Sequence, residues 1–184
     1  MARTESTMMA LGTSAPDFVL TDVATGRQVS TQAVAGPKGL LVMFICRHCP
    51  FVKHLEKALA QLGENYATSG VGIVAISSND AAKYPDDAPE SLAEQARAFG
   101  FIFSYLYDET QDVARAYDAA CTPDFFLFDA GLKLVYRGQF DDSRPGNAIP
   151  VTGKDLRGAL DALIAARPIS PDQRPSIGCN IKWK

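Results

Sequence analysis

Two continuous apolar runs, separated by a segment with helical periodicity, most constrain the fold of this chain. The runs cover residues 40–45 and 71–76. Apolar runs of this length are typical of strands that are buried on both faces of a sheet. Between them, apolar residues recur at helical spacing from Phe51 to Leu62, with charged residues interspersed. This order predicts a parallel strand pair joined by a right-handed helical crossover, and therefore an α/β sheet.

The flanking segments predict further elements around this unit. Residues 18–22 and 25–29, with Gly26 in the turn, are typical of a short edge hairpin. The other expected elements are a helix from Pro89 to 99 capped by Gly100, a strand at 105–107, a helix at 111–117, a hairpin of strands 125–128 and 132–136, and a helix at 155–166. We therefore expect a central mixed sheet flanked by helices, with an N-terminal hairpin extension.

The length, the net charge and the short apolar runs of the chain argue against several classes of protein. A chain of 184 residues corresponds to about one domain, and we see no linker or repeat that would divide 1–184. The net charge is −3 and the basic residues are spread along the chain, which argues against a nucleic-acid partner. The longest apolar run, 40–46, is far shorter than the roughly 18 residues of a membrane span. The start has no apolar secretory segment, so we expect a cytoplasmic protein without membrane contact.

The chemistry-bearing residues gather in one stretch, residues 46–54. Both histidines of the chain, His48 and His54, and two of its four cysteines, Cys46 and Cys49, lie there. The stretch joins a buried strand to a helix, outside the carboxyl end of the strand, where open α/β sheets place their sites. We expect the functional site at this junction.

Cys49 is the candidate nucleophile. Pro50 is best tolerated as a first helical residue, which makes Cys49 the predicted N-cap with its sulfur at the positive helix end. The orphan N–H groups there, with Arg47 and Lys53 nearby, favour a thiolate and a lowered pKa. Cys46, three residues upstream, can close a small disulfide and is the first candidate for the resolving thiol.

A metal site is the competing interpretation of the same residues. Cys46, Cys49, His48 and His54 nominally supply four ligands, but tetrahedral zinc sites usually recruit a second pair from a separate knuckle, and the sequence offers none. We therefore expect redox chemistry, with no metal and no bound organic cofactor. His48 either tunes the thiolate or is a solvated turn residue.

Several motifs resemble one known group of proteins. Residues 41–49 align without a gap on the strand that leads to the first active-site cysteine of thioredoxin-like proteins, 15–18 resemble the opening of redoxins, and 122–128 resemble the cis-proline strand. The chain thus resembles AhpC/TSA-type redoxins of the thioredoxin-like superfamily over most of residues 11–166, with 167–184 as a C-terminal tail. Four segments resemble its little-characterised "peroxiredoxin-like" branch more closely: 46–54, 121–129, 141–147 and 175–184.

The resemblance implies a thioredoxin-like fold and adds site residues. It implies that Pro123 follows a cis bond and packs against the start of the active-site helix, with Thr122 offering its backbone to an incoming peptide or thiol. It also places Cys121 near Cys49 as a second candidate resolving thiol. Cys179 is a weaker third candidate, because the tail would have to fold back over the site.

The sequence departs from the patterns of both related groups. Val52 stands where thioredoxins have their second cysteine, so the dithiol is shifted upstream to Cys46 and Cys49. The peroxiredoxin pattern Pro-x-x-x-Thr-x-x-Cys is also missing, since Val42 and Cys46 occupy its Pro and Thr positions. Peroxiredoxins further place an Arg before the strand that begins here at Phe125, and this chain has none there.

We therefore expect a thiol–disulfide oxidoreductase in which the Cys49 thiolate attacks a disulfide and Cys46 or Cys121 resolves the mixed disulfide. The expected partners are protein or small-molecule disulfides and a reducing partner such as thioredoxin or glutathione. The first alternative is an antioxidant thiol peroxidase in which peroxide oxidises Cys49 to a sulfenic acid. The second is a non-catalytic module that binds a metal or a thiol.

Overall fold

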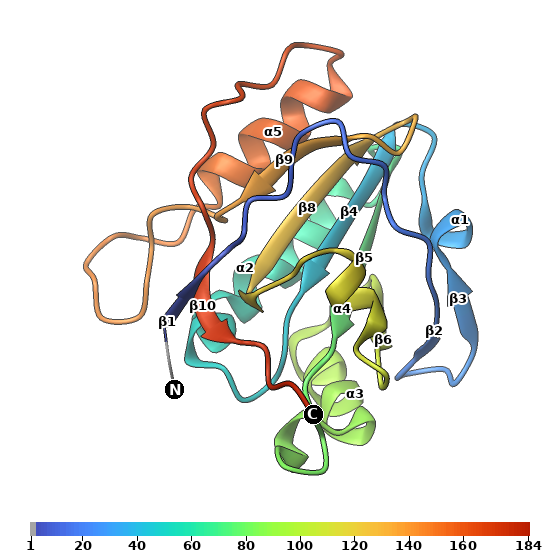
Figure 1. Cartoon of the computed structure of the whole chain (residues 1–184). Helices are drawn as coiled ribbons and strands as arrows, with labels where there is room; N and C mark the ends of the chain where they lie inside the picture. Colours follow the sequence, from blue (N-terminus) through green and yellow to red (C-terminus); the bar gives the residue numbers. More distant parts are fainter. Residues whose placement is uncertain (1–2) are drawn as a thin grey trace.

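The two apolar runs form adjacent central strands. In the computed structural model, which describes residues 3–184, β4 (Gly39–Phe44) lies beside β5 (Val71–Ser77), and α2 (Pro50–Tyr66) connects them (Figure 1). The backbone N–H of Ile45, just after β4, donates to the carbonyl of Ile76 at 3.0 Å. The predicted strand–helix–strand unit is confirmed.

The sheet extends from these two strands in both directions. On one side β4 pairs antiparallel with β8 (Asp124–Asp129), which pairs antiparallel with β9 (Leu134–Gly138). On the other side β5 pairs parallel with β6 (Ser104–Tyr107), which pairs antiparallel with β2 (Val19–Asp22). The hairpin of β2 and β3 (Gln28–Ser30) forms the outer edge. The sheet is therefore mixed, with the N-terminal hairpin as an extension, as predicted.

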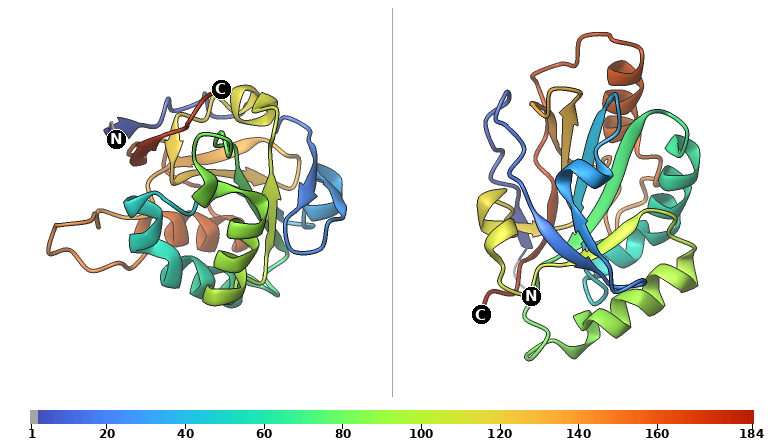
Figure 2. Two further views of the ribbon diagram at one scale, coloured as in Figure 1. Left: turned by 90° about the horizontal axis from the view of Figure 1, so that it is seen from below. Right: turned by 90° about the vertical axis from the view of Figure 1, so that its right-hand side faces the viewer.

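Helices cover both faces of the sheet. Figure 2 (left) shows α2, α3 (Pro89–Phe99) and α5 (Lys154–Ile164) on one face and α4 (Asp112–Ala116) on the other. Two short helical segments, α1 (Thr31–Val34) and the 3₁₀ turn η1 (Pro85–Asp87), lie in the connections. Within residues 3–184, no helix is both long and apolar enough to cross a bilayer.

Alternation along the central strands divides the core into two layers. Successive side chains of a strand point to opposite faces, so β4 and β8 each supply both layers. The layer under α2 contains Leu41, Met43, Ile45, Phe125 and Leu127. The opposite layer contains Leu40, Val42, Phe44, Phe126 and Phe128. All ten side chains are fully buried, each worth roughly 1.5–3 kcal/mol, and together they fix the carboxyl end of β4, where the site begins.

The C-terminal tail belongs to a second, small sheet that the sequence did not predict. In it, β10 (Ile177–Asn180) lies between β1 (Arg3–Glu5) and β7 (Cys121–Thr122), antiparallel to both. Figure 1 shows this layer beside the start of α2, next to the main sheet. Beyond β10, the side chain of Ile181 is buried in the opposite core layer. The chain therefore returns to the strand-to-helix junction at its end.

Candidate active site

Cys49 occupies the position that the sequence predicted. It is the N-cap of α2, with extended backbone angles, and Pro50 is the first helical residue. The proline fits because the first helical N–H has no acceptor in the helix. Cys49 is fully buried, at the junction of α2 with β7 and β10.

The sulfur of Cys49 lies in a cluster of polar contacts. Its Sγ is 2.7 Å from Sγ of Cys179 and 3.2 Å from the carbonyl oxygen of Thr122. The pKa of Cys49 is lowered to about 5, mainly by a hydrogen bond from the thiol of Cys46. Burial raises this pKa, whereas hydrogen bonds from Cys179 and from the backbone N–H of Val52 lower it further. At neutral pH, Cys49 is therefore a thiolate.

The cause of this lowered pKa differs in part from the sequence-based expectation. The helix N–H groups do contribute, but the two nearby cations do not rank among the causes. Arg47 turns to α3, where its guanidinium binds the carbonyl of Ser91 at 2.8 Å and the carboxylate of Glu94 at 2.9 Å, and Lys53 is exposed. Neighbouring thiols take their place as the stabilising groups.

Cys46 is the thiol that supports Cys49. It is fully buried at the end of β4, with its Sγ 3.2 Å from Oγ1 of Thr122 and 4.0 Å from Nδ1 of His48. Burial, followed by its hydrogen bond to Cys49, raises the pKa of Cys46 well above the usual value. Cys46 consequently keeps its proton and acts as a donor to Cys49.

His48 is held by a residue that the sequence analysis missed. Its Nδ1 hydrogen-bonds Oδ2 of Asp87, and its ring stacks on Tyr84 with centroids 5.3 Å apart. Asp87 is fully buried and also accepts from the backbone N–H groups of Arg47 (2.8 Å) and His48 (3.1 Å) and from the amide of Asn79 (2.8 Å). Burial alone would raise the pKa of Asp87, but these hydrogen bonds, led by His48, lower it. His48 is thus a fixed member of the site and not a solvated turn residue.

The segment before β8 supplies the opposite wall. The Thr122–Pro123 bond is cis, as the resemblance implied. Because side chains alternate along β7, Thr122 faces Cys46 and Cys121 points the other way. Sγ of Cys121 instead lies 3.5 Å from the carbonyl of Pro123, and burial raises the pKa of this thiol far above its usual range.

Cys179, which the sequence analysis ranked last, is the cysteine whose sulfur contacts Cys49 at 2.7 Å. Burial, together with the Cys49 contact, raises its pKa to about 12. The tail does fold back over the site. Ile181 is buried, whereas Trp183 is 39 % exposed and stacks with Arg115. The one sequence feature that indicates this packing of the tail is the apolar content of residues 177–183.

Three side chains of the site could also hold a metal ion. Sγ of Cys46, Nδ1 of His48 and a carboxylate oxygen of Asp87 lie within 4.8 Å of one another. This set is one ligand short of a tetrahedral zinc site, and its members already satisfy one another through hydrogen bonds. His54, nominally a fourth ligand, instead bonds the Ser143 hydroxyl at 2.7 Å.

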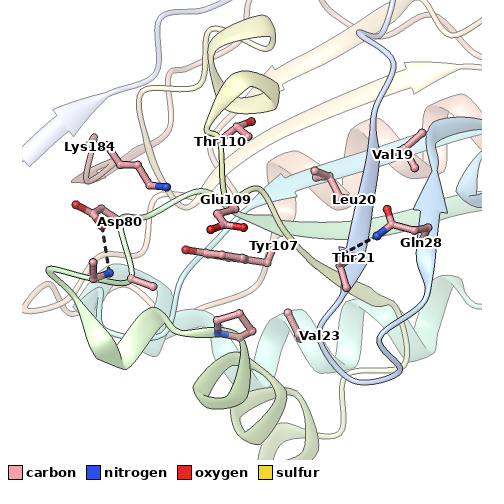
Figure 3. Close-up of a pocket in the computed structure, with 13 residues that line it drawn as sticks. Val19, Leu20, Thr21, Val23, Gln28, Asp80, Tyr107, Glu109, Thr110 and Lys184 are labelled. Carbon is pink, nitrogen blue, oxygen red and sulfur yellow. Dashed lines mark hydrogen bonds between the residues drawn. The ribbon is translucent and has the colours of Figure 1, made fainter.

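A groove of about 660 Å³ lies elsewhere on the protein, and its lining includes Leu20 of β2, Asp80, Tyr107, Glu109 and Lys184 (Figure 3). None of the four cysteines lines it. The thiol cluster is therefore a packed junction and not part of this groove.

The sequence and the fold match those of known proteins. The family model described as AhpC/TSA family matches residues 11–137. The chain belongs to the AhpC/TSA family. It is similar to the thiol-disulfide oxidoreductase ResA of Geobacillus kaustophilus, with 32 % identity over 126 residues that cover 68 % of this chain and 67 % of that protein.

Solved structures of other proteins share this fold. An uncharacterized conserved protein from Geobacillus kaustophilus is 56 % identical, with a TM-score of 0.98 over 100 % of this chain and 97 % of that one. A hypothetical protein from Sinorhizobium meliloti is 49 % identical, with a TM-score of 0.96 over 98 % of both chains. The thioredoxin domain of a thiol-disulfide oxidoreductase from Bacteroides vulgatus, 22 % identical with a TM-score of 0.59 over 74 % of this chain and 90 % of that one, shares the fold. The predicted thioredoxin-like fold is confirmed.

Proposed function

We propose that this protein is a thiol–disulfide oxidoreductase in which the Cys49 thiolate is the nucleophile. The observation that carries the proposal is the contrast among the four cysteines. Hydrogen bonds lower the pKa of Cys49 to about 5, while burial raises the pKa of each of the other three. Only a thiolate attacks a disulfide, so neutral pH selects one cysteine of this site as the attacking group.

The reaction follows from this contrast. The Cys49 sulfur attacks one sulfur of the substrate disulfide, forms a mixed disulfide, and releases the other substrate sulfur as a thiolate that takes up a proton. A second thiol of the site then attacks the Cys49 sulfur and releases the remaining half of the substrate. Cys46 has a different task before the attack, because its thiol donates the hydrogen bond that stabilises the Cys49 thiolate.

The substrate class is a disulfide, in a protein or a small molecule. Because each turnover leaves the protein oxidised, a reducing partner such as thioredoxin or glutathione must return the dithiol state. Similarity to ResA, which is named a thiol-disulfide oxidoreductase, supports this class. The cytoplasmic location stays a prediction from the sequence.

A thiol peroxidase is the second candidate, favoured by membership of the AhpC/TSA family and by a second sulfur 2.7 Å from Cys49. In that reaction peroxide oxidises Cys49 to a sulfenic acid, and a neighbouring thiol displaces hydroxide to give a disulfide and water. The protein would then act as an antioxidant. The Thr that peroxiredoxins place three residues before the cysteine is Cys46 here, so a thiol replaces the hydroxyl.

One comparison of oxidants tests the two candidates. Fully reduced protein is mixed with one equivalent of glutathione disulfide or of hydrogen peroxide, and modified cysteines are mapped by mass spectrometry against time. We expect glutathione disulfide to modify Cys49 faster than peroxide does. Rapid sulfenic acid formation at Cys49, with slow reaction of the disulfide, would instead make the peroxidase the better assignment.

A further inference from the structure

Cys49 has a sulfur neighbour that comes from the far end of the chain. The two cysteines are 130 residues apart in sequence, yet their Sγ atoms are 2.7 Å apart. This is about 0.7 Å longer than a disulfide bond, so the two sulfurs are in direct contact. We propose that Cys179 is the resolving thiol of the Cys49 reaction and that strand β10 holds it in place, an inference that rests on the proposed function.

The register of the small sheet sets the position of Cys179. In the antiparallel pairing of β10 with β7, Cys179 lies opposite Thr122, the residue whose carbonyl oxygen is 3.2 Å from the Cys49 sulfur. A shift of one residue along β10 would turn the side chain at this position to the other face of the strand. The pairing therefore fixes which side chain of the tail meets Cys49.

Gly178 lets β10 approach closely enough for this contact. A Cβ atom at this position would lie 2.0 Å from the carbonyl oxygen of Thr122 and 3.0 Å from the backbone nitrogen of Pro123. Only glycine allows the strand to press against this peptide unit without moving it. Two features of the same short strand, a glycine and a cysteine, thus serve one contact.

Hydrogen bonds from residues just before and just after β10 anchor the strand over the site. Before the strand, the hydroxyl of Ser176 donates to the carbonyl of Pro123 at 2.6 Å. After it, the backbone N–H of Ile181 donates to the carbonyl of Ala120 at 3.1 Å, and that of Lys182 to Oδ1 of Asn79 at 2.8 Å. The resolving thiol is consequently held against Cys49 and does not need to be recruited from a mobile tail.

The alternatives within the site are less well placed. Cys121 points to the other face of β7, and its Sγ contacts the carbonyl of Pro123. Cys46 does contact Cys49, but its hydrogen bond stabilises the attacking thiolate, and its Sγ is also 3.2 Å from the hydroxyl of Thr122. Assigning resolution to Cys179 leaves Cys46 free to perform this supporting task.

The resolving step balances without any further reactant. In the mixed disulfide, Cys49 is bonded to one sulfur of the former substrate disulfide. Once Cys49 is bonded in the mixed disulfide, its charge and its hydrogen bond no longer raise the pKa of Cys179. The Cys179 thiolate attacks Sγ of Cys49, the bond from Cys49 to the substrate sulfur breaks, and the departing substrate thiolate takes up the proton that Cys179 has lost. The products are a Cys49–Cys179 disulfide and a second substrate thiol, so the substrate disulfide gains two electrons and the protein loses two.

Matched cysteine variants test the assignment. Reduced wild type, Cys179→Ser, Cys46→Ser and Cys121→Ser each receive one equivalent of glutathione disulfide, are quenched in acid at intervals, and are mapped by mass spectrometry. We expect wild type and Cys121→Ser to accumulate the Cys49–Cys179 disulfide. In Cys179→Ser, the mixed disulfide of Cys49 with glutathione should persist at least 10-fold longer. Cys121→Ser is the matched control, since it removes another buried thiol beside β10.

The Gly178→Ala variant tests the role of the strand while keeping all four thiols. Its added methyl group displaces β10 from Thr122, so we expect initial modification of Cys49 to continue and resolution to slow. A Cys46–Cys49 disulfide in wild type, or a mixed disulfide of unchanged lifetime in Cys179→Ser or Gly178→Ala, would overturn the assignment to Cys179. Absence of any mixed disulfide at Cys49 in every variant would instead contradict the proposed function itself.

Discussion

Asp87 and His48 share a partly buried hydrogen bond that ties the 3₁₀ turn η1 to the turn that carries Cys46 and Cys49. The same carboxylate accepts the backbone N–H groups of Arg47 and His48, so one side chain from a distant loop satisfies the strand-to-helix turn. Backbone N–H groups that are withdrawn from water without an acceptor cost free energy, and Asp87 supplies the acceptor for both of these partly buried groups. Asp87 therefore fixes the conformation from which the cysteines project.

Replacing Asp87 should weaken this turn. Asp87→Asn keeps the shape but loses the charge-assisted bonds, and we expect the free energy of unfolding to fall by about 1–3 kcal/mol at pH 7. The pKa of Asp87 is lower in the folded state than in the unfolded chain, where it is about 4. The ionised Asp87 therefore contributes to the free energy of unfolding above about pH 4, and this contribution is lost as the pH falls through the folded-state pKa. Urea unfolding at pH 7 and pH 3 measures this. The exposed neighbour serves as the control in Asp86→Asn, and equal losses in both variants would contradict the prediction.

The Cys49 thiolate should be visible in a direct titration. Thiolate absorbance near 240 nm should rise with a midpoint near pH 5 in reduced wild type, because Cys49 ionises there. Cys49→Ser should lack this step, since the other three thiols have raised pKa values. A first midpoint near pH 8.5, the ordinary value for cysteine, would show that the site does not stabilise the thiolate.

Removing the thiol of Cys46 should raise the pKa of Cys49. The hydrogen bond from Cys46 is the largest cause of the lowered value, so Cys46→Ala should move the absorbance midpoint of Cys49 up toward the ordinary one. Cys46→Ser keeps a donor and should move it less. Identical midpoints in wild type and both variants would exclude this role for Cys46.

Asp124, which follows the cis proline, should make stability fall with rising pH. This carboxyl is fully buried, and burial raises its pKa to about 7. The unfolded chain ionises it near pH 4, so the folded state binds more protons between these values and loses stability as pH rises through them. Asp124→Asn should flatten this part of the curve. Urea unfolding at half-unit intervals from pH 4 to pH 8 checks it, and parallel curves for variant and wild type would refute it.

The sequence predicted those parts of the fold whose signals are local. The buried runs of β4 and β5, the amphipathic pattern of α2 and the left-handed cap at Gly100 each lie within a few residues. The N-cap position of Cys49 followed from Pro50 alone. These features depend on backbone geometry and periodicity, which neighbouring residues determine.

The missed parts depend on contacts between distant segments. Strand β10 has four residues, and its partners lie more than 50 residues away in β7 and more than 170 residues away in β1, too far for any local pattern to indicate the pairing. Asp87 lies in the connection between β5 and α3, which has neither helical nor strand periodicity, and its partner His48 is 39 residues upstream. The contact of Cys179 with Cys49 depends on both the tail and β7, so only the folded chain brings it about.

The role of Cys49 as the nucleophile is tested most directly by following this cysteine through one turnover. Reduced wild type and Cys49→Ser are mixed with equimolar glutathione disulfide at pH 7, and release of glutathione is measured together with the cysteine that carries the mixed disulfide. We predict that wild type releases glutathione through a mixed disulfide at Cys49 and that Cys49→Ser reacts at least 10³-fold more slowly. Release from Cys49→Ser at the wild-type rate would contradict the assignment of Cys49 as the nucleophile.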